Sequence, residues 1–140
     1  MFDLYGTERL TEWKKFRDTL ETSESPLEDI ADLWSKAPFV NPYLDPKDPE
    51  SWPDPWHLIL DGKMDDLAIT LGMLYTMTLT QRFMGTPCEI HMSIPNKNKE
   101  PSYFLVVDKQ FVLNYDPRKV VKFESLDMPT DIIWTAPSKH

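Results

Sequence analysis

The sequence contains a single cysteine, Cys88, in 140 residues. An internal disulfide is therefore excluded, and chains so poor in cysteine are typical of the reducing cytosol rather than of secreted proteins. Because Cys88 belongs to an alternating apolar pattern, we interpret it as a buried apolar side chain and not as a nucleophile. We expect a protein that is not secreted.

Glycine and histidine are also scarce. With four glycines in total, the chain has no Gly-rich loop that could bind phosphate groups. His57 and His91 lack the spacing of zinc ligands. Cys88 and His91 stand three residues apart on an expected strand, so their side chains should point to opposite faces and form no catalytic dyad. The sequence thus predicts no cofactor and no metal.

Long apolar runs are missing as well. The stretch Leu67–Thr80 carries no charge, but it is too short and too rich in threonine for a membrane span. Near the N-terminus, Phe2–Tyr5 is brief and interrupted by Asp3, which does not fit a signal peptide. We expect no membrane segment.

Positive charge is sparse in the first half. Residues 1–66 carry 7 Lys and Arg against 16 Asp and Glu, and the whole chain has a net charge of −8. Such an acidic surface repels phosphate backbones, so nucleic acid is an unfavourable partner. The acidic half is explained either by ordinary solubility or by a basic protein partner.

Apolar residues are concentrated in the stretch 62–84, where leucines 67, 71 and 74 mark one helical face and Ile69, Met73 and Met77 another. A helix that is apolar nearly all round is buried. Asp65 and Asp66 stand at its start, where the helix dipole favours carboxylates. We predict that residues 62–84 form the central helix of one domain.

Two helices are predicted before this stretch, within residues 1–37. Thr7 is the expected N-cap of the first. The motif Ser25-Pro26-Leu27-Glu28 combines a capping box with proline at the first helical position and predicts the start of the second. Trp34 should lie on the buried face of that second helix.

Residues 38–61 contain six prolines between positions 38 and 55, interleaved with large aromatic side chains. Regular helices and central strands do not tolerate this density of proline. We predict an extended segment that packs across the body of the domain and leads into the central helix.

After residue 84 the apolar period changes from 3.6 to 2. The alternation from Cys88 to Ile94 predicts a half-buried strand, and segments 102–107 and 111–115 predict a hairpin, with one more strand near Val121. The range 88–124 is thus read as antiparallel strands and 125–140 as a C-terminal arm. We predict a single α+β domain over 1–140, with the helices packed on a small antiparallel sheet.

The buried helix with Gly-x-Met-x-Asp-x-Ala at its start (62–68), the turn Gly85-Thr86-Pro87 and the pair Asp116-Pro117 resemble the core of transglutaminase-like proteins, relatives of the papain-like cysteine proteases. The resemblance implies a nucleophilic cysteine at the helix start, a histidine that opens a strand and an aspartate at the end of the next.

The positions that the resemblance assigns to catalysis are not filled by catalytic residues, except that Asp116 falls on the aspartate. Met64 falls on the nucleophile, and its thioether cannot attack a carbonyl carbon. Ser102 or Tyr103 falls on the histidine, and neither is a general base near neutral pH. The resemblance therefore implies a pseudoenzyme, a transglutaminase-like scaffold without the family's chemistry.

The segments WPDPWHLIL, DDLAITLGMLY and TQRFMGTPCEIHMS also resemble small proteins of tailed phages that infect cyanobacteria. This likeness implies a phage protein located in the cytoplasm of the infected host cell or associated with the virion.

Two classes of function remain open. The first is a non-enzymatic accessory or structural protein that binds a phage or host protein, or a second copy of itself, through exposed aromatic side chains; the candidates are Phe39, Tyr43, Trp52, Trp56 and Trp134. The second is a hydrolase or transferase whose site combines Asp116, His57 or His91 with Cys88. We expect the first.

Overall fold

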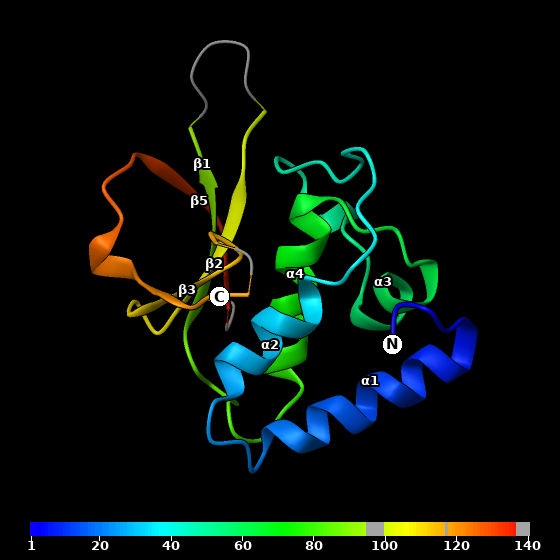
Figure 1. Cartoon of the computed structure of the whole chain (residues 1–140). Helices are drawn as coiled ribbons and strands as arrows, with labels where there is room; N and C mark the ends of the chain where they lie inside the picture. Colours follow the sequence, from blue (N-terminus) through cyan, green and yellow to red (C-terminus); the bar gives the residue numbers. More distant parts are fainter. Residues whose placement is uncertain (95–99, 117, 137–140) are drawn as a thin grey trace.

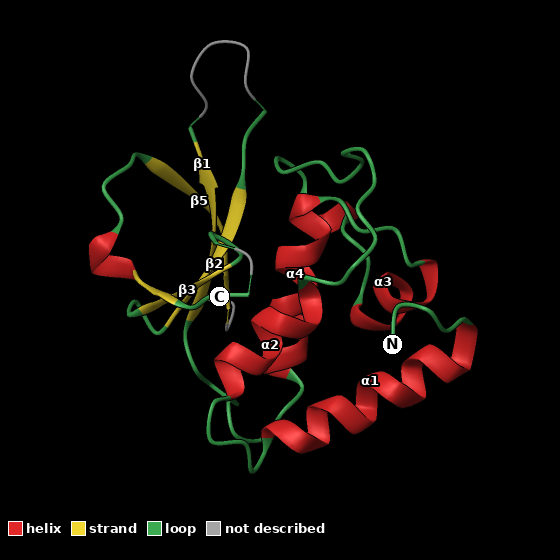
Figure 2. Ribbon diagram, viewed as in Figure 1, coloured by secondary structure: helices red, strands yellow, loops and turns green. Residues whose placement is uncertain are grey.

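The fold was described from a computed structural model, which covers residues 1–94, 100–116 and 118–136. It is an α+β domain in which the helices pack on a five-stranded antiparallel sheet with the strand order β4-β3-β2-β1-β5 (Figures 1 and 2). The α-helices are α1 (Gly6–Leu20), α2 (Pro26–Trp34), α3 (Pro55–Asp61) and α4 (Asp66–Thr78). The strands are β1 (Cys88–Ser93), β2 (Tyr103–Val107), β3 (Phe111–Leu113), β4 (Val121–Lys122) and β5 (Thr130–Ala136).

Helix α4 is the centre of the domain, as predicted. It stands between the sheet and the other helices, with α2 against one side and α1 and α3 beyond (Figure 1). Ten of its thirteen residues are buried, including polar Thr70 and Thr76. A helix enclosed on all sides has to be apolar all round, which explains the uncharged stretch in the sequence.

The ends of α4 differ from the prediction of 62–84. The helix begins only after Asp65, its N-cap, because Gly62 adopts a φ of 68° and terminates α3 instead. A Cβ at Gly62 would also collide with the Arg9 guanidinium. Glycine in the left-handed conformation is a common helix end. After Thr78 the chain turns, so residues 79–84 lie outside the helix.

The proline-rich segment was predicted to be extended through residue 61, and this is wrong for its last part. Pro55 occupies the first turn of α3, and the Asp54 side chain accepts a hydrogen bond from His57 N, so residues 55–61 are helical. Proline is favoured there because the missing N–H is not needed. Residues 49–51 form a short 3₁₀ turn. The remainder packs across the body, where the hydroxyl of Tyr75 donates to Pro53 O at 2.7 Å.

The predicted caps of the first two helices are not made as expected. Helix α1 starts at Gly6 with Tyr5 as its N-cap, so Thr7 lies inside the helix and does not cap it. Helix α2 starts at Pro26 as predicted, but the Ser25 side chain makes no capping hydrogen bond. Instead, Ser25 N donates to Ser23 Oγ at 3.1 Å.

The predicted hairpin of β2 and β3 is confirmed, and so is the short strand β4. The C-terminal arm predicted for residues 125–140 is wrong over 130–136, which form β5 and pair with β1 from Cys88↔Ala136 to Ser93↔Thr130. Residues 137–140 of the predicted arm lie outside the described residues. The sheet therefore places its last strand beside its first.

Strand β1 is covered on both faces, although its alternation predicted one solvated face. Ile90 lies in the core against the helices, and His91 on the other face is also buried. The ring of His91 stacks on Phe104 at 5.5 Å and meets Phe123 edge-on at 5.6 Å. This small second cluster includes Val106 and Val112. Polar His91 therefore belongs to a packed surface.

Candidate functional site

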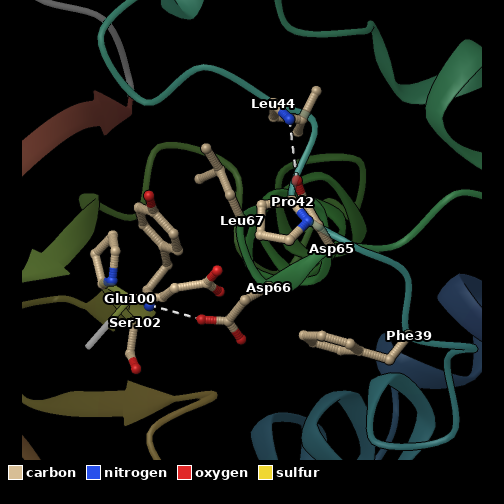
Figure 3. A pocket seen from close by; sticks show the side chains of 10 residues that line it. Phe39, Pro42, Leu44, Asp65, Asp66, Leu67, Glu100 and Ser102 are labelled. Carbon is tan, nitrogen blue, oxygen red and sulfur yellow. Dashed lines mark hydrogen bonds between the residues drawn. The ribbon is translucent and has the colours of Figure 1, made fainter. Parts of the chain in front are cut away.

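A pocket of about 460 Å³ opens where the N-terminus of α4, the segment after α2 and the start of β2 converge (Figure 3). Its wall combines apolar rings with carboxylates. The lining residues are Phe39, Pro42, Leu44, Asp65, Asp66, Leu67, Glu100, Pro101, Ser102 and Tyr103.

Asp65 ties the proline-rich segment to α4. Its Oδ1 accepts the Ala68 N–H at 2.7 Å, which caps the helix. Its Oδ2 accepts the N–H groups of Tyr43 at 2.8 Å and Leu44 at 3.0 Å. Asp65 is buried, so these bonds satisfy a carboxylate that water does not reach. The Asp65 side chain thus holds the segment around Tyr43 and Leu44 against the start of α4, and both line this side of the pocket.

Asp66 ties α4 to the sheet. Its Oδ2 accepts the Tyr103 N–H at 2.7 Å, and its Oδ1 accepts Asn114 Nδ2 at 3.1 Å. Burial raises the pKa of the Asp66 carboxyl, while the bonds from Tyr103 and Asn114 oppose that shift. Figure 3 shows Asp66 between Phe39 and Ser102. Two further cavities, of about 290 and 250 Å³, are also lined by Asp66.

Asn114 holds this arrangement together. Its amide nitrogen lies 2.9 Å from Thr70 Oγ1 and 3.0 Å from the Tyr103 carbonyl oxygen, besides the bond to Asp66. Its backbone has a φ of 68°, a conformation that asparagine adopts more readily than most residues. The sequence reasoning missed Asn114. The available signal was an asparagine directly after a short apolar strand.

Of the positions that the transglutaminase-like resemblance assigns to catalysis, only some lie at the pocket. Ser102 and Tyr103 line the pocket. Met64 is wholly buried in the core, and its backbone pairs with that of Phe39 in an isolated parallel β-bridge. Asp116 does not line the pocket, and its carboxylate lies 3.6 Å from Lys119 Nζ. At the helix start, the side chains that line the pocket are Asp65, Asp66 and Leu67.

The aromatic candidates for binding separate into three places. Phe39, 66% exposed, forms the rim of the pocket, and nearby Tyr43 donates its hydroxyl to Lys63 O at 2.6 Å. Burial, with Asp65 and Asp61, raises the pKa of Tyr43 to about 12. Trp52 packs against Trp134 at 5.9 Å, and Trp56 lies on α3 against Trp13 at 5.8 Å.

The residues of the alternative, enzymatic site have other partners. Cys88 is buried, and burial together with Asp108 raises the pKa of its thiol to about 12, so the thiol form dominates at neutral pH. His91 lies between Glu89 and Thr130. His57 is exposed and contacts Asp54 at 2.8 Å. Among the described residues, no hydrogen bond or ion pair joins two of Cys88, His57, His91 and Asp116.

Within residues 1–94, 100–116 and 118–136, no cluster of three or more His, Cys, Asp and Glu side chains could hold a metal ion. The helices in the described part of the chain are all too short or too polar to cross a membrane. Comparison with family models, with curated proteins and with solved structures found no match to this chain.

Proposed function

We propose that this chain is a non-enzymatic accessory or structural protein, and that it binds a basic side chain of a partner protein in the pocket at the N-terminus of α4. The observation that carries the proposal is the pairing of an exposed aromatic rim, Phe39, with carboxylates in one cavity of about 460 Å³. Pockets of a few hundred cubic ångströms with a few convergent polar groups are typical ligand sites.

A cation fits this chemistry better than an anion does. Among the described residues, the wall of the pocket carries Asp65, Asp66 and Glu100 and no lysine, arginine or histidine. An ionised carboxylate can accept about four hydrogen bonds. Asp66 accepts two from Tyr103 and Asn114. The face of Phe39 can attract an ammonium or guanidinium group as well.

The transglutaminase-like resemblance supports binding over catalysis. On that pattern the nucleophile position is Met64, which is buried and chemically inert toward carbonyl groups. We expect no transamidase or thiol-protease turnover from the purified protein. Turnover that Cys88→Ser abolishes would contradict the proposal.

The binding test uses minimal probes, N-acetyl-lysine amide and N-acetyl-arginine amide, titrated into the isotope-labelled protein. The Asn114 side-chain amide is the reporter, because its nitrogen contacts Asp66. We expect saturable shifts at Asn114 and Tyr103 that strengthen as the pH rises, since deprotonation of Asp66 creates the negative charge. Asp66→Asn should weaken binding at least tenfold, whereas the matched control Glu28→Gln, on the exposed surface of α2, should not.

Phe39→Ala separates the rim from the carboxylates. Because Phe39 is largely exposed, its removal should leave the fold intact and weaken probe binding by about 0.5–2 kcal/mol, the range of a cation–π contact. Equal binding to wild type, Phe39→Ala and Asp66→Asn would overturn the assignment.

The resemblance to phage proteins extends the proposal to location. It implies a phage or host partner, met in the cytoplasm of the infected cell or in the virion. Mass spectrometry of purified particles, together with capture from infected cells, distinguishes the two locations. A homo-oligomer is the remaining alternative, which light scattering tests.

A further inference from the structure

Arg17, on α1, is a buried arginine whose Nε lacks a hydrogen-bond partner among the residues that the structure describes. It is 8% exposed. The ion pairs within α1 join Lys14 to Asp18 and Lys15 to Glu12, and they leave Arg17 out. Asp18 lies close enough to favour the charged form of Arg17, but its carboxylate is bonded to Lys14. A buried N–H without a hydrogen-bond partner is costly.

The other buried arginine shows the contrast. Arg9 donates from Nε to Leu4 O and from Nη1 to Ile59 O, both at 2.9 Å. Arg17 instead has aromatic rings around its guanidinium, with Trp13 at 4.4 Å and Trp56 at 5.7 Å. Cation–π contacts recover part of the lost hydration, but they leave the Nε–H without an acceptor. Burial also lowers the pKa of Arg17.

The surface around this guanidinium is apolar and accessible. Trp56 is 46% exposed and Leu60 is 41% exposed. The two are four residues apart on α3, which places them on one face of that helix. Helices α1 and α3 pack against each other, so the rings of Trp13 and Trp56 meet at 5.8 Å over Arg17. We name this surface, formed by Arg17, Trp56 and Leu60 over the buried ring of Trp13, the α1–α3 seam.

We propose that the α1–α3 seam binds an acidic segment of a protein partner, one of whose carboxylates pairs with Arg17 while a neighbouring apolar side chain packs on Trp56 and Leu60. Arginine presents a planar fork of donors that matches a carboxylate. Lys14 and Lys15 on the same helix are paired with Asp18 and Glu12, so the attraction for a carboxylate comes from Arg17 itself. The seam requires the opposite charge from the α4 pocket, so this proposal goes beyond the proposed function and does not depend on it.

The test selects ligands for the full chain from a displayed library of random dodecapeptides. We expect enriched peptides to contain Asp or Glu next to an apolar residue and to quench or shift the tryptophan fluorescence. Arg17→Met should weaken their binding at least tenfold, and so should replacing the peptide's acidic residue by its amide. Phe39→Ala and Asp66→Asn, which alter the α4 pocket, should leave it unchanged.

Thermal unfolding supplies a second readout that a purely structural arginine would not give. Replacing a buried charged side chain by an apolar one of similar length often stabilises a protein. Arg17→Met should therefore raise the unfolding temperature while binding is lost. Arg17→Lys, which keeps the charge but loses the planar fork, should bind the selected peptides more weakly than wild type.

Four results would overturn the inference. The first is an enriched set without acidic residues, or with binding that Arg17→Met leaves intact. The second is a clear loss of stability in Arg17→Met, which would make Arg17 a structural residue. The third is displacement of the peptides by equal concentrations of inorganic phosphate, the mark of a general anion site. The fourth is a dimer that Arg17→Met dissociates, which would place a second copy on the seam.

Discussion

Thr76 shows how a single hydroxyl can organise the core. It accepts hydrogen bonds from the indole N–H groups of Trp13 and Trp34, both at 3.0 Å, and donates to Gly72 O at 2.7 Å. Two helices are thereby attached to α4 at one buried point. The sequence predicted Trp34 on the buried face of its helix, but nothing local indicated that one threonine would bond both tryptophans.

Thr76→Val should therefore be severely destabilising for its size. It keeps the shape of the side chain but leaves two buried N–H donors without acceptors, at about 1–3 kcal/mol each. We expect the free energy of unfolding in urea to fall by at least about 2 kcal/mol. Thr76→Ser, which retains the hydroxyl, is the control and should lose much less. Similar losses for both variants would show that packing, not hydrogen bonding, is what matters there.

The second residue-scale prediction concerns acid titration of Asp66. Its folded-state pKa is raised above the ordinary 3.8 by burial, so the native state holds this proton more tightly than the unfolded chain does. The stability that Asp66 contributes is thus fully present below pH 3.8 and is lost as the pH rises through the folded-state pKa. Measured against Asp66→Asn, wild type should become less stable as the pH rises above 3.8. A relative stability that increases over this window would mean that the pKa is lowered instead.

At the scale of elements, α4 and the segment after α2 depend on one another through Asp65. The helix needs a cap, and the proline-rich chain cannot supply its own regular hydrogen bonds, so one carboxylate serves Ala68, Tyr43 and Leu44. The apolar pattern identified α4 correctly. It could not locate the first residue, because Asp65 and Asp66 are equally good caps from sequence alone.

Asp65→Ala should detach the segment as well as uncap the helix. Loss of a cap costs about 0.5–2 kcal/mol, and the freed N–H groups of Tyr43 and Leu44 add to this. We expect faster hydrogen exchange at both amides and earlier proteolysis within residues 38–48. The comparison variant Asp48→Ala, at the residue before the 3₁₀ turn, should leave exchange at Tyr43 and Leu44 unchanged.

Other elements show why local patterns predict some faces and not others. Gly72 lets the Trp34 ring approach α4 closely, because a Cβ at this position would come within 3.0 Å of that ring. His91 was expected on a solvated face, because a polar residue in an alternating strand normally points outward. Its burial follows from Phe123 and Leu126, which come from a distant part of the chain and cover that face. The alternation of apolar and polar residues along a strand cannot show whether a distant segment covers its polar face.

For the molecule as a whole, the contact between Trp52 and Trp134 joins the proline-rich segment to the last strand. Both residues were predicted as binding candidates. Their rings lie 5.9 Å apart, and Trp52 packs against the main core. The pair links parts of the chain that are far apart in sequence. The sequence singled out Trp52 and Trp134 as binding candidates, but it could not show that their side chains contact each other.

A double-mutant cycle measures this link. Trp52→Ala and Trp134→Ala should each destabilise the fold, and the double variant should lose less than the sum, with a coupling of about 0.5–1.5 kcal/mol for an aromatic pair. Trp52→Ala combined with Trp56→Ala is the control, because those two side chains have different aromatic neighbours and should be additive. A coupling near zero for Trp52 and Trp134 would mean that the two rings act independently.

The strand order also has a consequence for biosynthesis. Strand β1 pairs with β5 along the edge opposite to β2, so that edge stays open from the synthesis of Ser93 until Thr130–Ala136 has emerged. An open strand edge can pair with other chains. Translation of the intervening stretch, roughly forty residues at about 5–20 residues per second, keeps that edge unpaired for roughly two to eight seconds. During that interval the open edge of β1 can pair with neighbouring nascent chains on the same messenger RNA. A chaperone that covers this edge would prevent such pairing.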